Sequence, residues 1–547
     1  MSEITSEERR SRIGAKTVGP NITGGAKVNS FNILDPNGIA EILGFARAKG
    51  VSFWLANGKL HYRAPKDALT HSEMERLRRS KAQIVALLET STASQAAEPL
   101  LVPRQRLDHV PLAFSQAAHW NLYRLNQRRC IRQIAGATRL CGCLNIKALR
   151  ESIAEIVRRH EALRTRIVFS KDDGTLVQEI DERGRSELVV IDLRTVPNEL
   201  REAAVTDSIE QLILEPIDPA LGPLFGTRLL QLNELEHVLI VAMEHMISDA
   251  YSLNILWEEI FSAYRQISQG RVVYLPPVPI QFADYAVWQR EAHTSWIYKH
   301  SAYWAERLVG IQRLHFPTGK CFQTSTRPGW GCVPLPISRD LKERLAKWAR
   351  VRQTTLVMSI FTAYVGLVLH WCNVSDVLVQ YQIDGRACQK LRRTIGYVAS
   401  VLYLRISIVE TDNFVDLLNR VTKEYCQAYE HSDSSYMESQ IPRPAFTLNP
   451  FFNWVPDADQ TDIVDAGEAI TTSTVRFEHP IGRNLDRDNE PMVELRDTEG
   501  EVLGGVYFAL SRYSTDAMEV FGRNFFHFIG ALLDRPEQRL RDIPLLQ

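Results

Sequence analysis

Between residues 237 and 267 the apolar residues first form a continuous run and then recur at the spacing of a helix. Residues 237–243 (HVLIVAM) form the run, which predicts a buried strand. From residue 253 onward the apolar side chains recur every three or four positions, which predicts a helix over residues 253–267. Residues 244–252, which lie between the two elements, are therefore expected at the end of a buried strand. The apolar face of the helix consists of Leu253, Leu256, Trp257, Ile260, Phe261 and Tyr264.

A shorter pattern near the N-terminus predicts a β-hairpin. Residues 51–56 (VSFWLA) and 59–63 (KLHYR) flank Asn57-Gly58, a dipeptide typical of a tight two-residue turn. A helix is predicted before the hairpin, and a second helix after it, over residues 70–88, begins with a capping box. The pattern indicates a small α-β-β-α unit.

The segments on either side of this unit are polar. Residues 1–28 contain glycines and show no periodicity, so they are predicted to be a flexible leader. Residues 91–106 are rich in small residues and contain two prolines, which is typical of a linker. The α-β-β-α unit is therefore predicted to span residues 29–90.

The composition narrows the class of protein. The chain has 547 residues, of which 45% are apolar and 24% charged, as in soluble globular proteins with more than one domain. A formal net charge of −1 gives no general attraction to nucleic acid or to anionic membranes. No apolar run is long enough to span a membrane, and the N-terminus lacks the apolar core of a signal peptide. A cytoplasmic protein is expected.

The eight cysteines do not follow a paired metal-ligand spacing. Cys141 and Cys143 are separated by one glycine and lie beside apolar leucines, which favours a strand over a pair of metal ligands. Reduced thiols and no bound metal are therefore expected.

The polar stretch after the predicted strand contains a candidate for acid–base chemistry. His245 precedes Asp249 by four positions. Imidazole can accept a proton near neutral pH, and a nearby carboxylate can hold the local geometry. By spacing alone, however, a histidine after a strand is more often a structural residue, so this pattern leaves both interpretations open.

Several short blocks of sequence resemble known signatures and follow one another in a fixed order. They are residues 114–120 (FSQAAHW), 159–165 (RHEALRT), 244–252 (EHMISDAYS), 281–289 (QFADYAVWQ), 384–386 (DGR), 395–398 (IGYV) and 449–453 (NPFFN). The ordered set resembles the condensation domains of nonribosomal peptide synthetases. In the third block the second motif histidine, the aspartate, the aromatic residue and the serine match, whereas Glu244 replaces the first histidine and Ala250 replaces a glycine.

The resemblance implies an α/β fold for residues 107–547, with two chloramphenicol-acetyltransferase-like subdomains arranged in a V. A division near Pro276 predicts an N-terminal subdomain over residues 107–275 and a C-terminal subdomain over residues 276–547. The cleft between them is implied to form a tunnel, with a carrier-protein entrance at each end and His245 near its centre. Because no adenylation or carrier domain follows, the resemblance implies a free-standing enzyme.

Residues 29–90 resemble the β-hairpin docking domains found at the N-termini of some synthetase and hybrid polyketide synthase subunits. Such domains capture the C-terminal tail of the preceding subunit as an extra strand along the hairpin. Basic residues on the hairpin imply an acidic tail, although the charges on the following helix are explained equally well by solvation. The candidate docking residues are Trp54, Lys59, Arg63, Lys66, Arg78 and Arg79.

The reaction implied by the resemblance is acyl transfer. The donor arrives as a thioester on the phosphopantetheine arm of an acyl- or peptidyl-carrier protein, and no cofactor is expected on the chain itself. An amine or hydroxyl of a small-molecule or carrier-bound acceptor attacks the thioester, and His245 would accept or hold its proton. Asp249 is implied to be structural and paired with Arg386, and Ser252 is a supporting residue. The architecture favours a dedicated transfer or chain-release step in polyketide or peptide antibiotic biosynthesis.

Glu244 and Ala250 leave a rival function open, namely a catalytically inactive condensation-like module that recruits a carrier protein or partner enzyme. In a strand, residue 244 would point away from the tunnel if His245 points into it, so a glutamate with a partner such as an arginine could be tolerated. Ala250 places a methyl group where the backbone would approach the thioester. The presence of His245 and Asp249 favours a working enzyme, and His245 also disfavours a cyclising condensation domain. An epimerisation domain is disfavoured because no carrier domain precedes it.

Overall fold

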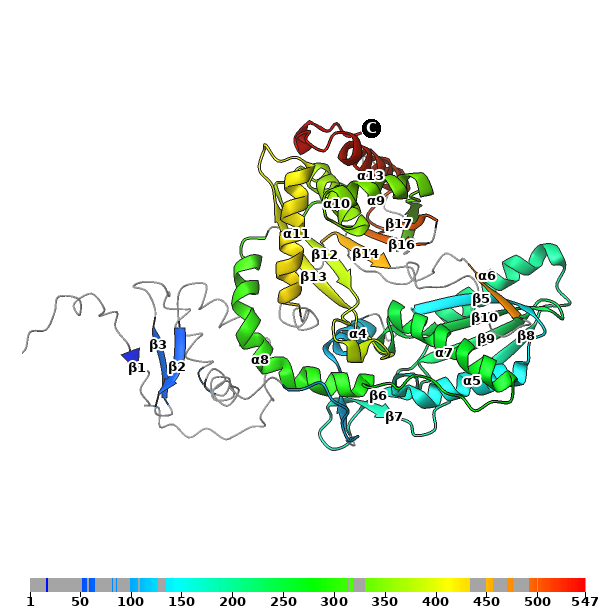
Figure 1. Cartoon of the computed structure of the whole chain (residues 1–547). Helices are drawn as coiled ribbons and strands as arrows, with labels where there is room; N and C mark the ends of the chain where they lie inside the picture. Colours follow the sequence, from blue (N-terminus) through cyan, green and yellow to red (C-terminus); the bar gives the residue numbers. More distant parts are fainter. Residues whose placement is uncertain are drawn as a thin grey trace, which may run out of the picture. The chain divides into compact units, whose positions relative to one another are not determined.

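The computed structural model contains two compact units (Figure 1). The hairpin unit consists of Met1–Leu100, Glu291–Ile311 and Tyr436–Arg443, and the main unit of Leu101–Arg290, Gln312–Ser435 and Pro444–Gln547. The structure describes residues 16–17, 52–56, 59–63, 81, 85, 99–106, 109–125, 134–185, 187–311, 314–317, 330–432, 449–455, 470–475, 491–498 and 500–546.

The hairpin unit contains the hairpin that the sequence predicts. Strands β2 (Ser52–Ala56) and β3 (Lys59–Arg63) pair antiparallel, with Leu55 opposite Leu60. Strand β1 (Lys16–Thr17) pairs with the other edge of β3, so the sheet order is β1-β3-β2. The predicted hairpin is confirmed, and β3 is its central strand.

Strand β1 lies within residues 1–28, where the sequence predicts a flexible leader. Strand pairing uses backbone N–H and C=O groups, so a two-residue strand needs no apolar alternation that the sequence could reveal. Lys81 and Val85 are helical, within the helix predicted over residues 70–88. The helix predicted before the hairpin, the turn and three candidate docking residues lie outside the described residues; these three are Lys66, Arg78 and Arg79.

The first large sheet of the main unit has five strands in the order β15-β5-β10-β9-β8 (Figure 1). Helices α5 and α7 cover one face and α6 covers the other. The members are β5 (Ile134–Gly142), β8 (Leu188–Asp192), β9 (Phe225–Gln231), β10 (Glu236–Met243), β15 (Ile470–Thr474), α5 (Ile146–Arg159), α6 (Asn198–Leu214) and α7 (Ala250–Ser268).

Strand β10 explains why residues 237–243 are continuously apolar. Leu239 and Val241 pack into the core shared with α5 and α7, whereas Val238 and Ile240 pack into the core under α6. Because both faces of the strand are covered, every position from 237 to 243 is buried. The predicted strand and the predicted helix after it are confirmed, and α7 begins three residues earlier than the apolar spacing alone indicates.

Strand β15 comes from far along the chain and pairs antiparallel with β5, with Ile470 opposite Gly142. The sequence predicts two consecutive subdomains divided near Pro276, and β15 departs from that order because it follows Pro276 yet completes the first sheet. Cys141 lies in β5, as predicted for a strand residue, and both Cys141 and Cys143 are exposed free thiols.

A small three-stranded sheet and helix α4 also belong to the main unit. The sheet order is β4-β7-β6, and helix α4 packs against the short helix η3 that follows β10. The members are β4 (Val110–Pro111), β6 (Thr165–Phe169), β7 (Leu176–Ile180), α4 (Phe114–Leu125), η2 (Glu161–Arg164) and η3 (His245–Ile247).

The second large sheet of the main unit has six strands in the order β11-β17-β16-β14-β12-β13 (Figure 1). Strand β14 runs parallel to both of its neighbours, so the sheet is mixed. Its strands are β11 (Trp330–Pro334), β12 (Asp376–Ile383), β13 (Ser400–Ser407), β14 (Phe451–Val455), β16 (Met492–Asp497) and β17 (Val502–Ala509).

Helix α10 is the central helix of this second half. It packs against α9, α11 and α13, and its residues from Met358 to Leu369 are buried. The helices that the structure describes after residue 281 are α8 (Phe282–Leu308), α9 (Arg339–Val351), α10 (Leu356–Trp371), η4 (Gln389–Leu391), α11 (Phe414–Glu430), α13 (Thr515–Asp534) and η7 (Leu540–Asp542). In the part of the chain that is described, no single helix has the length and apolarity to cross a membrane; α9 and α10 do so only as a pair bent by 98°.

The C-terminal end of the predicted linker is bound to the main unit. The carboxylate of Asp284 accepts from the backbone N–H of Arg104 at 2.9 Å and from the Arg106 guanidinium at 2.5 Å. Lys390 donates to the backbone oxygen of Leu101 at 3.0 Å. These polar contacts hold a segment whose composition alone indicates a linker.

Candidate active site

The candidate site begins where β10 ends at Met243. Glu244 has extended backbone and caps the short helix η3, which carries His245. Asp249 is again extended and caps α7 through a reciprocal capping box with Ser252. The polar residues between strand and helix are thus turn and cap residues, and these caps direct the chain from β10 into α7.

The orientation of the His245 ring is set by a backbone hydrogen bond. Its Nδ1 atom lies 2.8 Å from the carbonyl oxygen of Ser248. A carbonyl oxygen can only accept, so Nδ1 carries the hydrogen and the neutral ring has its lone pair on Nε2. The side chain is half-buried. Nε2 is therefore the atom that can take a proton.

Glu244 is a buried structural residue. Its side chain accepts from the backbone N–H of Met246, and its own N–H donates to the carbonyl oxygen of Leu224 at 2.8 Å. Its carbonyl oxygen accepts from the Ser248 hydroxyl at 2.9 Å. Glu244 does not follow strand alternation, because β10 ends at Met243, one residue before it.

Asp249 and Arg386 form a buried, bidentate ion pair. The guanidinium donates from Nη1 to Oδ2 at 2.7 Å and from Nη2 to Oδ1 at 3.0 Å, and both side chains are almost fully buried. Burial by itself would raise the pKa of Asp249, but the charge and hydrogen bonds of Arg386, together with those of Ser252, lower it overall. The residue pair that the family resemblance implies is thus paired in the structure.

The same carboxylate also binds the backbone of the segment before β13. Oδ2 of Asp249 accepts from the N–H of Val398 at 3.1 Å and from that of Ala399 at 3.0 Å. The Ser252 hydroxyl lies 3.0 Å from the carbonyl oxygen of Gly396, and the N–H of Gly396 donates to that hydroxyl at 3.1 Å. Asp249, Ser252 and Arg386 therefore fix residues 396–399 against the start of α7.

Ala250 and Tyr251 occupy the first turn of α7. Ala250 is exposed and is the first helical residue, where alanine is favoured and no left-handed backbone is needed. Tyr251 lies beneath the Arg386 guanidinium, 4.7 Å from the ring centroid. The replacement of the family's glycine by Ala250 therefore places no strain on the backbone at this position.

Two aromatic rings that the sequence reasoning left without a role contact His245. The ring centroid of Tyr397 lies 4.1 Å from that of His245, and the ring centroid of His119 lies 4.9 Å from it. His119 is on α4, and Tyr397 lies in the segment before β13. Both residues belong to blocks that match the family signatures, and this was the feature of the sequence that could have indicated a place near His245.

The block at residues 159–165 builds the core and does not form a second site. His160 Nε2 lies 2.7 Å from Glu259 Oε2, and Arg159 donates to the same carboxylate oxygen at 3.0 Å. Burial would raise the pKa of Glu259, but His160 and Arg159 lower it overall. This cluster ties α5 to α7.

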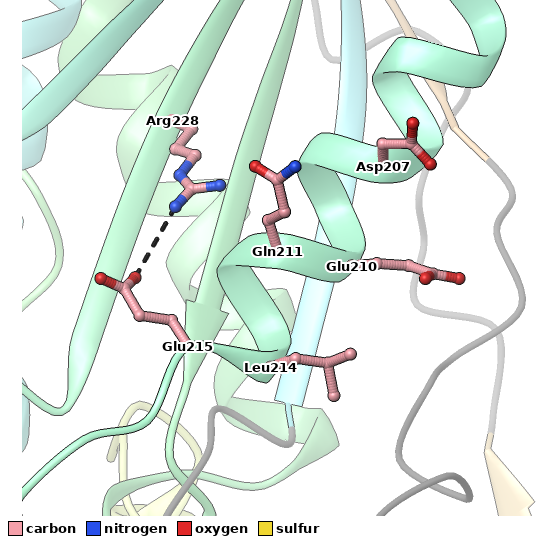
Figure 2. A pocket seen from close by; sticks show the side chains of 6 residues that line it. All are labelled: Asp207, Glu210, Gln211, Leu214, Glu215 and Arg228. Carbon is pink, nitrogen blue, oxygen red and sulfur yellow. Dashed lines mark ion pairs between the residues drawn. The ribbon is translucent and has the colours of Figure 1, made fainter.

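A shallow pocket lies on the α6 side of the first sheet (Figure 2). Its volume is about 570 Å³. Arg228 pairs there with Glu215 at 3.7 Å, and none of the lining residues belongs to the matched blocks. The pocket is lined by Asp207, Glu210, Gln211, Leu214, Glu215 and Arg228.

Of the candidate docking residues, the structure describes Trp54, Lys59 and Arg63, and these only by their backbone. Trp54 lies in β2 opposite His61, and Lys59 and Arg63 lie at the two ends of β3. Among the described residues, no group of His, Cys, Asp and Glu side chains could hold a metal ion.

Two family models match the chain. The description of the first is "Condensation domain", and it matches residues 106–547. The description of the second is "TubC N-terminal docking domain", and it matches residues 39–89. Together they cover most of the chain.

Curated relatives include components of linear gramicidin synthase from Brevibacillus parabrevis. One of them is 30% identical over 488 residues, which is 85% of this chain. Another component of the same synthase is 28% identical over 466 residues, which is 84% of this chain. The chain spans only 9% of the length of each of these relatives.

Solved structures share the fold at low sequence identity. The X-domain from teicoplanin biosynthesis gives a TM-score of 0.69 at 21% identity, covering 82% of this chain and 100% of that one. The first condensation domain of the calcium-dependent antibiotic synthetase, in complex with substrate analogue 2a, gives 0.67 at 18% identity, covering 81% and 100%. The chloramphenicol-acetyltransferase-like fold is therefore confirmed. The chain belongs to the condensation domain family of nonribosomal peptide synthesis and carries a TubC N-terminal docking domain.

Proposed function

We propose that this protein is an acyltransferase that condenses a carrier-bound acyl thioester with an amine or hydroxyl acceptor. The observation that supports the proposal is the hydrogen bond from His245 Nδ1 to the Ser248 carbonyl oxygen. It leaves the Nε2 lone pair of the neutral ring as a base, next to the buried pair of Asp249 and Arg386. No other residue is required to change its protonation state.

The reaction needs little beyond positioning and one proton transfer, because a thioester is already activated. The acceptor nitrogen or oxygen forms a bond to the acyl carbon, and the carbon–sulfur bond breaks. Nε2 of His245 takes the proton of the acceptor and passes it to the departing phosphopantetheine thiolate, so the ring ends neutral and the thiol leaves. Asp249, Arg386 and Ser252 hold the surrounding backbone, and they are not assigned a step in the chemistry.

The partner of a condensation domain is a carrier protein, and we propose that the hairpin unit receives the tail of that carrier. Strand β3 is central in the described sheet, with β1 and β2 on its two sides. The edge strands of the described sheet are therefore β1 and β2, and we propose that a tail adds to the outer edge of β2, which is the longer of the two. An acidic tail is proposed because Lys59 and Arg63 are the first and last residues of β3 and are basic.

Calorimetry with a synthetic acidic tail peptide tests this docking. Deletion of residues 51–63 should abolish binding, and Lys59→Glu with Arg63→Glu should weaken it more at low salt than at high salt. Binding that survives the deletion would contradict capture by the hairpin.

Intact-protein mass spectrometry tests the acyl transfer. An acyl-loaded carrier that bears its native tail is incubated with the protein and with a panel of amines and alcohols. Wild-type protein should unload the carrier only when an acceptor is present, and the mass of the product separates amide from ester formation and from simple chain release. His245→Ala should abolish unloading. His109→Ala is a matched control, because His109 is an exposed histidine that pairs with Asp172.

The second candidate function is a non-catalytic module that recruits a partner. It is favoured by a fold similarity to the teicoplanin X-domain solved in complex with OxyB, with a TM-score of 0.68 at 21% identity. The replacement of the first motif histidine by Glu244 points in the same direction. Carrier binding without unloading by any acceptor would favour this second function.

A further inference from the structure

The aromatic rings of His119 and Tyr397, which come from two other segments of the chain, both contact the ring of His245. The Tyr397 ring lies against the His245 ring at a centroid distance of 4.1 Å and an interplanar angle of 40°. The His119 ring approaches both, at 4.9 Å from His245 and edge-on at 5.0 Å from Tyr397. Of the two neighbours, Tyr397 is in closer contact with the imidazole.

The backbone on both sides of Tyr397 is held by the Asp249 network. The N–H of Gly396 donates to the Ser252 hydroxyl at 3.1 Å, and its carbonyl oxygen accepts from Arg386 Nη2 at 3.3 Å. On the other side, the N–H of Val398 donates to Asp249 at 3.1 Å. A shift of Asp249 or Arg386 would therefore move the residues that carry the Tyr397 ring.

Tyr397 is also held directly from α4. Its carbonyl oxygen accepts from the Ser115 hydroxyl at 3.0 Å, and Ser115 lies one helical turn before His119. The same helix thus binds the Tyr397 backbone and contacts its ring.

Glycine at position 396 allows this close approach. A Cβ atom there would lie 2.3 Å from ring atoms of Phe282, which is far inside van der Waals contact. The segment can therefore lie this close to α8 only with glycine at position 396, immediately before Tyr397.

The hydrogen bond from Nδ1 to Ser248 does not by itself fix the plane of the His245 ring, which can tilt about that bond. The hydrogen bond to Ser248 defines which nitrogen carries the hydrogen, and the ring contact with Tyr397 adds a second constraint on the ring plane. Together they define where Nε2 points, and misplacement by about 1 Å in such a site can lower the rate about a hundredfold.

We propose that Tyr397 is a positioning residue for His245, and that the Asp249–Arg386 pair acts on His245 through it. This inference rests on the proposed acyl transfer. In this proposal the aromatic ring of Tyr397 positions His245, and the hydroxyl of Tyr397 does not contribute. The Asp249–Arg386 pair is then linked to the imidazole of His245 through residues 396–398.

The test compares Tyr397→Phe, Tyr397→Leu and Tyr397→Ala with wild-type protein in carrier-unloading kinetics. Tyr397→Phe should keep kcat within about twofold, because the ring contact remains. Tyr397→Ala should lower kcat on the order of tenfold to a hundredfold with little change in the KM for the carrier, because the base is displaced while carrier binding is not. Tyr274→Ala is a matched control, since Tyr274 is 82% exposed.

A second measurement does not depend on turnover. Nitrogen-15 NMR of labelled histidine, assigned with His245→Asn, reports which ring nitrogen carries the hydrogen. Wild type and Tyr397→Phe should show one narrow set of His245 signals with hydrogen on Nδ1, whereas Tyr397→Ala should keep the hydrogen on Nδ1 and give broadened signals, because the ring can then tilt about its hydrogen bond. Asp249→Asn should show the same broadening if the pair acts through Tyr397.

The outcomes separate this inference from the proposed function. Wild-type kcat together with an unchanged His245 signal in Tyr397→Ala and Tyr397→Leu would overturn the positioning role. Equal losses in Tyr397→Phe and Tyr397→Ala would overturn it as well, by assigning the effect to the hydroxyl. If wild-type protein unloads nothing while Tyr397→Ala still alters the His245 signal, the acyl transfer is wrong and the positioning contact stands.

Discussion

The guanidinium of Arg386 binds both carboxylate oxygens of Asp249, at 2.7 and 3.0 Å, across 137 residues of sequence. Asp249 starts α7 in the first half of the main unit, and Arg386 follows β12 in the second half. The pair therefore connects the two large sheets beside His245. Most of the other hydrogen bonds of the two side chains go to backbone groups, as expected of a pair that holds the structure together.

The first prediction concerns the strength of this pair. Asp249→Asn leaves the Arg386 charge buried without a carboxylate, so the free energy of unfolding should fall by about 3–5 kcal/mol. Urea titration followed by tryptophan fluorescence measures the change.

A double variant separates lost attraction from an uncompensated charge. Asp249→Asn with Arg386→Met should be more stable than Asp249→Asn alone, because the buried charge is gone. A double variant less stable than either single variant would contradict a buried-charge penalty.

The second prediction concerns the pH dependence of stability. The pKa of Asp249 is lowered in the folded state, so the unfolded chain takes up the proton first as the pH falls. The stabilisation from Asp249 is fully present above the ordinary pKa of an aspartate, which is about 4, and it is lost as the pH falls through the lower pKa of the folded state. Melting temperatures from pH 7 to pH 3 should fall more steeply for wild type than for Asp249→Asn. Parallel curves would show that Asp249 makes no contribution.

The third prediction distinguishes the two nitrogens of His245. The amide nitrogen of asparagine can replace Nδ1 as the donor to Ser248, but His245→Asn has no base at the position of Nε2. The variant should fold with nearly wild-type stability, and its kcat should fall by about 10²–10⁴-fold if His245 is a general base. Single-turnover unloading of the carrier measures this loss. A loss of only a few-fold would assign His245 to positioning.

The fourth prediction concerns Glu244. Its side chain accepts from the Met246 N–H as a helix cap, so Glu244→Ala should lower the free energy of unfolding by about 0.5–2 kcal/mol. Glu244→Gln keeps an acceptor oxygen and should be close to neutral in stability and in kcat. A large loss of kcat in stable Glu244→Gln would show that the carboxylate takes part in the chemistry.

The fifth prediction concerns Ala250. Because it is an ordinary first helical residue, Ala250→Gly should destabilise α7 by about 0.5–1 kcal/mol and leave kcat unchanged. Thermal unfolding and unloading kinetics measured on the same preparation check both parts. A rise in kcat would mean that the methyl group obstructs the thioester.

Local patterns in the sequence were sufficient for the elements that frame the site. The apolar run at residues 237–243 predicted β10, the helical spacing from Leu253 predicted α7, and the two short runs on either side of Asn57-Gly58 predicted the paired strands β2 and β3. These succeed because burial of a strand on two faces, burial of a helix on one face and a hairpin of two short strands each impose a pattern within a few residues. The ordered blocks added the fold family and the pairing of Asp249 with Arg386.

Only the tertiary structure decided which distant segments meet. Nothing within residues 470–474 indicates that they complete the first sheet as β15, since an edge strand can pair with any available backbone. The contact of Tyr397 with His245 depends on how residues 396–399 bind Asp249 and on the absence of a side chain at Gly396. The nitrogen of His245 that is left to act follows from the local hydrogen bond to Ser248, whereas the ring of Tyr397 that contacts the imidazole comes from a distant segment. Sequence periodicity specifies which face of an element is buried, but the partner that buries it follows from packing between segments far apart in the chain.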